Sequence, residues 1–278
     1  MSTIHTTVVG LGLIGGSVAL SLRQAGRVVT GFDPDDLRRQ YSLDHDLIDR
    51  GAVTLESAVR DADEVFVAVP VLQSLIVLQD LDEVMSDEAV VVDAGSVKVP
   101  VVEHMQVLKH AAHMVGGHPM AGREVSGPEH ADPNLLKGRN FFLTPNSHTS
   151  PSVVHSIGVM VESMGAFPIV VDAHEHDRAA ATTSHLPQLM STVLAGMAGD
   201  SVLSYVGSAF RDATRIAASD SAMWRDIFVS NRDPLVATAQ EFLHRLQMAI
   251  DLIDRDDRPG IERLMLDGKS RAQLVAEQ

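Results

Sequence analysis

A glycine-rich segment near the start of the chain has the residue types and spacing of a turn that could bind phosphates. Gly10-Leu-Gly-Leu-Ile-Gly15 follows an apolar run and opens a stretch with helical spacing. Gly10 permits a tight turn, Gly12 lets the backbone approach a pyrophosphate, and Gly15 lets the helix pack closely on the strand. The free N–H groups of Leu13 and Ile14 would then face the phosphates at the positive end of the helix dipole.

An acidic residue lies about 20 residues further on, where a dinucleotide-binding motif needs one. Asp33 ends the second apolar run, and a carboxylate there accepts hydrogen bonds from the ribose hydroxyls of NAD and repels the 2′-phosphate of NADP. Arg38 and Arg39 nearby would weaken that preference. Val69 and Pro70 close a later strand, where the chain would turn beneath the cofactor. With Asp33 in register, the motif predicts NAD binding rather than a tight turn without a ligand.

One histidine is placed where it could act as a general base. His118 is one of 13 histidines, and it is flanked by glycine and proline on a loop after a predicted strand. Its ordinary pKa of about 6.5 would let it take a proton from a hydroxyl as hydride leaves for a nicotinamide. Ser96, on a neighbouring loop, could fix which ring nitrogen carries the proton. The alternative for any single histidine is a structural or solvated role.

A third group of polar residues lies in the second half of the chain. The segment His174-Glu-His-Asp177 could be half of a metal site, but no third ligand has a convincing spacing, so we expect no metal. Further on, two arginines lie beside small residues and suit bidentate capture of a substrate carboxylate. The alternative is an ion pair with a nearby aspartate, and we favour that alternative for Arg211.

Short apolar runs with strand composition alternate with helical stretches over the first part of the chain. The first four runs are continuous, which is typical of strands buried on both faces of a parallel sheet. Helical connections such as 16–25 and 72–85 complete βαβ units, which pack as a doubly wound sheet. The sequence therefore predicts an α/β Rossmann domain over residues 1–171. The expected strands are 6–9, 28–32, 64–69, 89–93, 113–115, 140–143 and 167–171.

Strand signals stop after residue 172, and helical stretches follow at 177–199, 202–218, 221–231 and 233–255. The last stretch carries apolar residues at alternating three- and four-residue steps, which suits packing against another helix. Burial in the domain's own core is the alternative, but a small helical domain does not easily cover several such stripes. We therefore predict an all-helical substrate and dimerisation domain over 172–278. The stripe that would be buried in a homodimer comprises Val236, Ala239, Leu243, Leu246, Ile250 and Ile253.

Composition excludes several classes of protein. The chain has 37 Asp and Glu against 22 Lys and Arg, a net charge of −15, which disfavours a nucleic-acid partner. No apolar run approaches the ~20 residues of a membrane span, so no membrane contact is expected. The absence of cysteine excludes disulfides and thiolate metal sites. The first residues lack the basic start and cleavage site of a signal peptide, which favours a cytoplasmic protein.

Five motifs, in this order and spacing, make the chain resemble the prephenate/arogenate dehydrogenase family. They are GLGLIGGS, DAGSVK, GGHPMAGRE, SHLP and FRDATRIAASD, and the resemblance extends from Val8 to about Ile253. The HPMAG and FRDATRIA blocks are far more discriminating than the glycine motif. The chain resembles the short, monofunctional form, without a chorismate mutase segment before it or a regulatory domain after it.

The resemblance implies NAD(P)-dependent oxidative decarboxylation in tyrosine biosynthesis. Members of the family oxidise the ring carbinol of prephenate or arogenate; hydride goes to the nicotinamide, the ring carboxylate leaves as CO2, and the ring becomes aromatic. His118 matches the histidine that hydrogen-bonds the 4-hydroxyl and accepts its proton, and Ser96 matches the serine that orients it. The residues implied around the substrate are Arg215, which anchors a carboxylate, His185 close to it, and Glu124 and Asp177, which match positions used for gating and polar contacts.

One position departs from the family pattern. Many prephenate-using relatives read SHLPH, whereas here the last residue is Gln188. Glutamine cannot become cationic, so it should hold the anionic pyruvyl side chain less firmly and favour arogenate, whose side chain carries an ammonium. Arg123 adds a positive charge that favours prephenate. From the wider resemblance we expect an NAD-dependent prephenate dehydrogenase that gives 4-hydroxyphenylpyruvate, with arogenate or dual-substrate cyclohexadienyl dehydrogenase activity as the alternative.

Two rival functions fit the sequence less well. A β-hydroxyacid dehydrogenase relies on a lysine in its helical domain, but this chain has no lysine between Lys137 and Lys269. A dinucleotide-binding sensor without catalysis would predict an eroded substrate site. Ser96, His118 and Arg215 are instead all present together.

Overall fold

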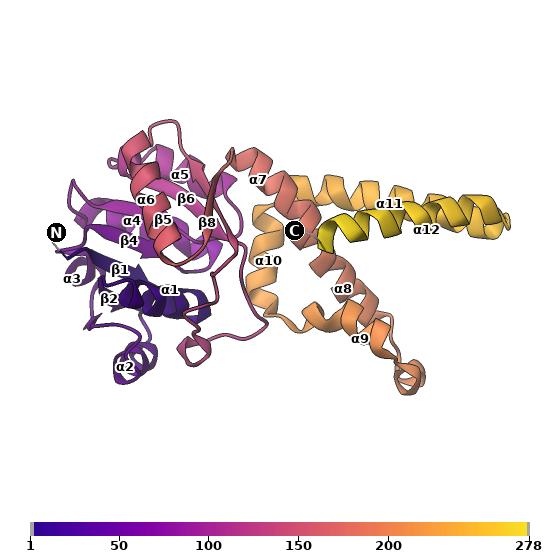
Figure 1. Ribbon diagram of the computed structural model, residues 1–278, viewed down its shortest axis with the longest axis horizontal. Coiled ribbons are helices and arrows are strands. Elements are labelled where there is room, and N and C mark those ends of the chain that lie inside the picture. The colour runs from indigo at the N-terminus through magenta and orange to yellow at the C-terminus, as the bar shows by residue number, and fades with distance from the viewer. Residues whose placement is uncertain (1–2, 277–278) are drawn as a thin grey trace. The chain divides into compact units, whose positions relative to one another are not determined.

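The computed structural model describes residues 3–276, and the strands between residues 5 and 170 form one eight-stranded sheet (Figure 1). The strand order is β3-β2-β1-β4-β5-β6-β7-β8, and all neighbours are parallel except β6 and β7. This confirms the predicted doubly wound α/β fold. The strands are β1 (His5–Val9), β2 (Val28–Phe32), β3 (Arg50–Ala52), β4 (Glu64–Val67), β5 (Val90–Asp93), β6 (Met114–Pro119), β7 (Asn140–Pro145) and β8 (Phe167–Val170).

Two features of the sheet were not predicted. β3 is an edge strand of three residues, Arg-Gly-Ala, and it carries no apolar run that could have predicted it. β7 runs antiparallel to β6, with His118 paired to Phe142. The connection between them has a short 3-10 turn, η2 (Pro128–His130), but no α-helix to carry the chain across the sheet. The chain therefore returns beside β6 in the opposite direction.

Helices cover both faces of the sheet, and alternate strand residues divide between two hydrophobic clusters. Val8 and Phe66 belong to one cluster with α1 (Leu13–Gln24) and α6 (Pro151–Ser163). Val9, Val65 and Val67 belong to the other cluster, which includes residues of α3 (Leu55–Val59), α4 (Val71–Val84) and α5 (Val99–Gln106). The central strands β1 and β4 are thus buried on both sides, as their continuous apolar runs predict. The helix α2 (Asp36–Asp44) and the turn η1 (Ala111–His113) complete this part.

The chain after β8 is helical, as predicted, but the helices differ in their bounds. A continuous helical segment comprises α7 (Ala173–Ala180), a π-helical turn η3 (Ala181–His185) and α8 (Leu186–Gly196). The predicted helix over 202–218 was wrong, because the segment divides into η4 (Asp200–Tyr205), α9 (Ser208–Thr214) and η5 (Arg215–Ala218). Gly207 precedes α9 in an extended conformation and so ends the preceding turn. The helix α10 (Ser221–Ser230) follows, and its Ile227 is buried in the second cluster.

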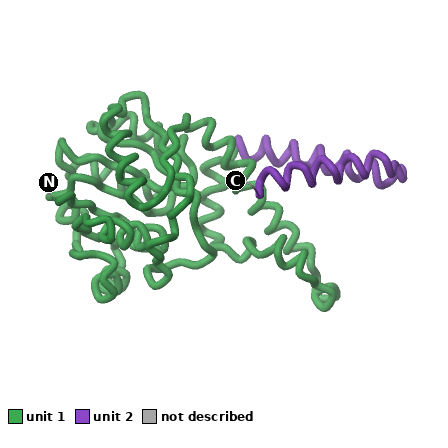
Figure 2. Tube along the Cα trace, in the orientation of Figure 1, with its two compact units in different colours: residues 1–232 green, residues 233–278 purple. Residues whose placement is uncertain are grey.

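The chain forms two compact units, residues 1–232 and 233–278 (Figure 2). The second unit holds nearly all of α11 (Arg232–Asp254) and the helix α12 (Arg258–Ala276), which the sequence did not predict. The two helices pack closely where Gly260 meets Leu252, since a Cβ on Gly260 would lie 2.6 Å from that side chain. No helix within residues 3–276 is long and apolar enough to cross a membrane.

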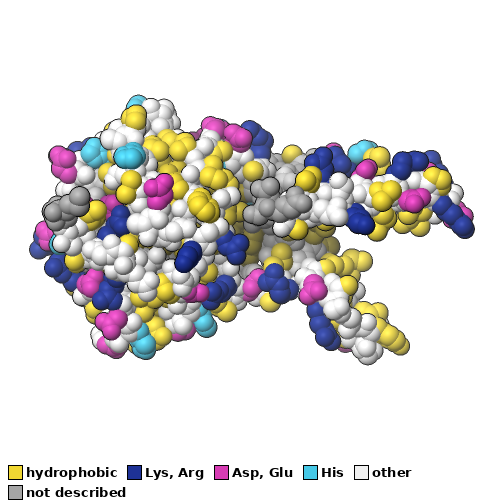
Figure 3. Space-filling view, in the orientation of Figure 1, with side chains coloured by type: hydrophobic (Ala, Val, Ile, Leu, Met, Phe, Trp, Pro, Cys, Tyr) yellow, Lys and Arg dark blue, Asp and Glu magenta, His cyan; other side chains and the backbone are white. Residues whose placement is uncertain are grey.

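The apolar stripe of α11 is exposed in the single chain. Five of its six residues, all except Ala239, have 44 to 66% of their surface accessible. Hydrophobic side chains are visible along the outer surface of α11 and α12 in Figure 3. The stripe therefore is not buried in the core of its own chain, which was the alternative to a dimer interface.

Candidate active site

The glycine turn between β1 and α1 is open where a phosphate would approach. Gly10 has φ +92°, a conformation that side-chain-bearing residues rarely adopt. A Cβ on Gly15 would lie 1.8 Å from the Gly10 carbonyl oxygen, whereas a Cβ on Gly12 would meet nothing within 4 Å. The N-cap residue of α1 has no side-chain hydrogen bond, so the first N–H groups, at Leu13 and Ile14, can face a bound anion.

Asp33 lies at the end of β2 and is tied to the glycine turn. Its carboxylate accepts hydrogen bonds from the backbone N–H of Leu11 at 2.8 Å and of Asp35 at 2.9 Å. Arg39 donates to the Asp33 carbonyl oxygen at 2.6 Å and also pairs with Asp36. Arg38 is 3.9 Å from the Asp33 carboxylate and half-exposed. The carboxylate keeps acceptor capacity for ribose hydroxyls, because each oxygen can accept more than one hydrogen bond.

Val69 and Pro70 lie directly beyond β4, and Val69 borders the glycine turn. A Cβ on Gly10 would lie 2.9 Å from the Val69 side chain and 2.4 Å from the carbonyl oxygen of Ala68. Pro70 then precedes the first turn of α4. These residues form one wall beside the glycine turn, at the same edge of the sheet.

A fully buried ion pair fixes the ends of β5 and β6. The ammonium of Lys98 donates to the Asp93 carboxylate at 2.5 Å and to the carbonyl oxygen of Gly117 at 2.7 Å. The other Asp93 oxygen accepts from the N–H of Gly117 at 2.9 Å. Gly117 precedes His118, so this pair sets the position of the β6 end that carries the histidine. Removing one partner would leave a buried charge unpaired, which costs several kcal/mol.

His118 is 9% exposed, and its ring nitrogen Nδ1 is 2.8 Å from Nε2 of His176 on α7. Burial lowers the pKa of His118 well below its ordinary value, and the nearby His176, Lys98 and His185 lower it further. The expectation of a pKa near 6.5 is therefore corrected downward. This lowered pKa favours the neutral form of His118, which can accept a proton.

The carboxylate of Asp177 is buried and accepts three hydrogen bonds from the chain. Two come from the backbone N–H groups of Lys98 and Val99 at the start of α5, both at 2.8 Å. The third is from Nδ1 of His176, also at 2.8 Å. A carboxylate at a helix N-terminus is stabilised by the free N–H groups and the dipole there. This geometry favours a structural role for Asp177 over the direct substrate contact that the family resemblance implies.

His185 ends the π-helical turn and is fully buried. Asn231 Nδ2 lies 2.9 Å from Nδ1 of His185 and donates to the carbonyl oxygen of Asp177 at 2.8 Å. The NH2 group of Asn231 can only donate, so Nδ1 of His185 accepts. The proton of the neutral His185 ring then lies on Nε2. Burial lowers the pKa of His185 to about 4. Its Nε2 has no hydrogen-bond partner among the described residues, which leaves one buried donor free beside Trp224.

Arg215 and Glu124 form an ion pair between η5 and the loop after β6. The Arg215 side chain is 63% exposed and that of Glu124 is 36% exposed, so the pair lies at the surface of the site. Gln188, in contrast, is buried, and its Nε2 donates to the carbonyl oxygen of Ile216 at 2.9 Å. Gln188 thus anchors the turn η5, whose first residue is Arg215.

The structure brings some predicted residues together and not others. Glu124 meets Arg215, and His118 lies in one hydrogen-bonded group with Asp177. Ser96 is half-buried on the loop after β5, but among residues 3–276 no hydrogen bond links its hydroxyl to His118. Sequence reasoning missed three residues of this group, namely His176, Lys98 and Asn231. The adjacent pair His176-Asp177 was visible, but only as an unsupported metal motif.

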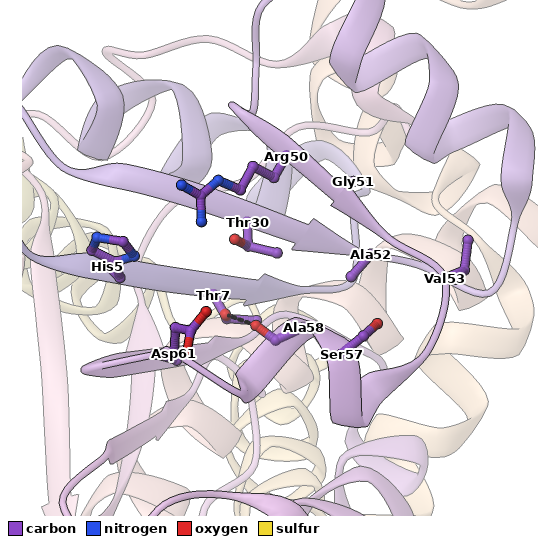
Figure 4. Close-up of a pocket in the computed structure, with 11 residues that line it drawn as sticks. His5, Thr7, Thr30, Arg50, Gly51, Ala52, Val53, Ser57, Ala58 and Asp61 are labelled. Atoms are coloured by element: carbon purple, nitrogen blue, oxygen red, sulfur yellow. Dashed lines mark hydrogen bonds between the residues drawn. The ribbon is translucent and has the colours of Figure 1, made fainter.

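Two other features carry no part of this site. A pocket of about 240 Å³ lies between β1, β2, β3 and α3 (Figure 4), lined by residues such as His5, Arg50 and Asp61 and by none of the predicted site residues. In it, the Thr7 hydroxyl donates to the carbonyl oxygen of Ala58 at 2.6 Å. Within residues 3–276, no group of three or more His, Asp or Glu side chains could hold a metal ion.

Comparisons with known proteins identify relatives over the whole described chain. Residues 18–170 match the family model "Prephenate dehydrogenase, nucleotide-binding domain", and residues 172–267 match "Prephenate dehydrogenase, dimerization domain". The prephenate dehydrogenase of Bacillus subtilis (strain 168) is 32% identical over 264 residues, which cover 91% of this chain and 71% of that protein.

Solved structures agree with the sequence matches. The prephenate dehydrogenase of A. aeolicus, in complex with hydroxyphenyl propionate and NAD+, has a TM-score of 0.91, 30% identity and 99% coverage of both chains. The Synechocystis arogenate dehydrogenase has a TM-score of 0.86 and 27% identity, covering 98% of this chain and 100% of that chain. With both domain models matched in order, the chain belongs to the prephenate dehydrogenase family.

Proposed function

We propose that this protein is an NAD-dependent prephenate dehydrogenase that converts prephenate to 4-hydroxyphenylpyruvate. The observation that carries the proposal is His118, a buried histidine at the carboxyl end of β6. It lies at the sheet edge that also carries the glycine turn, where open α/β sheets bind their ligands. Membership of the family and a relative solved with NAD+ and hydroxyphenyl propionate support it.

The glycine turn, His118 and Arg215 each have a separate role in the proposed reaction. NAD+, when bound at the glycine turn, supplies the hydride acceptor. His118 takes the proton of the 4-hydroxyl as the hydride leaves the ring carbon. The bond to the ring carboxylate then breaks, CO2 leaves, and its electron pair enters the ring, which becomes aromatic as the C=O pair moves onto the 4-oxygen. That oxygen takes back the proton from His118 and becomes the phenol hydroxyl. Arg215 holds a substrate carboxylate, which must first replace Glu124 as the partner of the guanidinium.

The second part of the chain, residues 172–278, acts as the substrate and dimerisation domain in this proposal, and residues 1–171 bind the dinucleotide. The boundary between the two matched family models, at 170 and 172, supports this division. The compact units divide elsewhere, because α7 and α10 pack against helices of the sheet domain.

Substrate choice between prephenate and arogenate depends on the surroundings of the side chain. The side-chain NH2 of Gln188 already donates a hydrogen bond within the protein, to the carbonyl oxygen of Ile216. It therefore adds little to the capture of either side chain. Arg123 lies beside Glu124 but pairs with Asp132, so its charge is partly neutralised. The curated relatives include both prephenate and cyclohexadienyl dehydrogenases, and we retain prephenate as the expected substrate.

The function is tested by turnover. Purified protein with NAD+ should produce NADH on addition of prephenate, with a higher kcat/KM for prephenate than for arogenate, because the wider family resemblance favours prephenate. The absorbance of NADH measures the rate with each of the two substrates. A ratio that favours arogenate by tenfold or more would overturn the substrate assignment, and no turnover of either would support a sensor protein instead.

His118 is tested by substitution and by pH. His118→Asn should lower kcat by about 10²–10⁴-fold and leave the Kd of NAD+ nearly unchanged, because the ring acts only on the reacting hydroxyl. In the unmodified enzyme, kcat/KM should fall as the pH drops through the pKa of His118, since the base must be neutral. The midpoint of this fall in kcat/KM should lie below pH 6.5, because burial lowers the pKa of His118. Unchanged kcat in His118→Asn, with half-exposed His113→Asn as a control, would remove the residue from the mechanism.

The cofactor preference is tested at Asp33. We expect kcat/KM to be at least about tenfold higher with NAD+ than with NADP+, which corresponds to roughly 1.4 kcal/mol. Asp33→Ser should narrow this ratio by removing the repulsion of the 2′-phosphate. Equal use of the two cofactors by the unmodified protein would contradict the assignment. Asp35→Ser, two residues along and exposed, is the matched control.

Assembly is tested on the α11 stripe. We expect a two-fold dimer, and Leu243→Glu with Ile250→Glu should shift it toward monomer, because charge would be buried in the interface. Met248→Glu, on the opposite side of the helix, should leave the dimer intact. Light scattering at micromolar concentration in low and high salt measures the mass. A monomeric unmodified protein in both salts would contradict the proposal.

A further inference from the structure

A chain of three buried side chains leads from the proposed base into the protein. Nδ1 of His118 is 2.8 Å from Nε2 of His176, and Nδ1 of His176 is 2.8 Å from an Asp177 carboxylate oxygen. The rings of His118 and His176 meet edge to face, with centroids 5.0 Å apart. Phe142, the strand partner of His118, packs on His176 in the same way at 5.6 Å. The His176 ring is therefore held on two sides.

The direction of the hydrogen bonds follows from Asp177. Its carboxylate already accepts from the N–H groups of Lys98 and Val99, so it is the acceptor for His176 as well. His176 must then carry its proton on Nδ1, and as a neutral ring its Nε2 is an acceptor. The facing nitrogen of His118, Nδ1, must donate to it. The remaining nitrogen of His118, Nε2, is left with a lone pair.

Three ionisable groups besides Asp177 lie near the two rings, namely Lys98, Asp93 and His185. The ammonium of Lys98 is near His118 and is fully buried, and it is paired with Asp93. His176 itself lies close to His185 and contacts the Asp177 carboxylate directly. A charged His176 would also donate from Nε2, and His118 would then hold its proton on the wrong nitrogen to act as a base.

We propose that His176 is a positioning residue for His118, which fixes the proton of the base on Nδ1 and keeps Nε2 free for the substrate hydroxyl. When His118 becomes an imidazolium, its Nδ1–H still has an acceptor, and a hydrogen bond from a charged donor is about twice as strong as one from a neutral donor. Asp177 is also a positioning residue: it accepts the hydrogen bond from Nδ1 of His176 and so leaves Nε2 of His176 as the acceptor for His118. The proposal rests on the proposed function, because it assigns His118 as the base.

The test compares two substitutions that differ in one property. His176→Phe keeps a ring against Phe142 but offers no acceptor to His118. His176→Gln keeps an acceptor, because its side-chain oxygen can reach the place of Nε2. We expect His176→Phe to lower kcat by about 10²-fold, and His176→Gln to stay within roughly tenfold of the unmodified enzyme. The Kd of NAD+ should change little in either variant.

A second measurement does not need activity. Exchange of the C2 hydrogen of each histidine, followed by mass spectrometry over a range of pH, gives the pKa of His118 in the folded protein. In His176→Phe this pKa should fall below that in His176→Gln, because both variants remove the charge that His176 could carry but only glutamine leaves the imidazolium an acceptor. His113→Phe, at a half-buried histidine outside the site, should move neither kcat nor this pKa.

The outcomes separate the two proposals. Equal loss of kcat in His176→Phe and His176→Gln, or the same pKa of His118 in both variants, would overturn the positioning role. Failure of the unmodified protein to oxidise prephenate or arogenate would overturn the proposed function, while the exchange measurement would still decide whether His176 controls His118. Thermal unfolding checks each variant, and His176→Leu replaces His176→Phe if the larger ring prevents folding.

Discussion

The positions of the reacting groups depend on one buried carboxylate, that of Asp177. It binds the N-terminal amides of α5 and so joins α7 to the sheet edge where β5 ends. Through His176 it reaches His118, and through its own carbonyl oxygen and Asn231 it reaches His185. One residue thus links the strand that carries the proposed base to the helices that carry the proposed substrate residues. A shift of α7 would change both histidines together.

The site is built largely from buried polar groups, and such groups are costly unless they are fully paired. The Lys98–Asp93 pair meets this condition through three further backbone partners, two of them on Gly117 and one on Gly95. A Cβ on Gly117 would lie 2.4 Å from the carbonyl oxygen of Asp93, so only glycine allows the close approach of β6 to β5. His185 and the neighbouring Trp224 are exceptions, since Nε2 of His185 and Nε1 of Trp224 have no partner among the described residues. A buried unpaired donor beside the substrate residues is consistent with a site that becomes complete only with a ligand.

The sequence was informative where the pattern is local. Short apolar runs predicted seven of the strands, and the glycine spacing with Asp33 predicted a turn whose geometry the structure reproduces. His118 could be singled out because glycine and proline surround it. The partner of His118 could not, because His176 lies 58 residues away and only the fold brings the rings together. For the same reason Asp177 was expected at the substrate rather than beneath the base. Local signals also failed for α12, since Pro259, Gly260 and Gly268 interrupt its pattern.

The central claim is that the buried chain ending at Asp177 sets the protonation of His118 before any substrate binds. The most direct measurement is ¹⁵N NMR of the unmodified protein labelled at histidine, with the His118 ring assigned by comparison with His118→Asn. At neutral pH the account predicts a neutral ring with a protonated, pyrrole-like Nδ1 and an unprotonated, pyridine-like Nε2. A ring with the proton on Nε2, or with protons on both nitrogens, would contradict it.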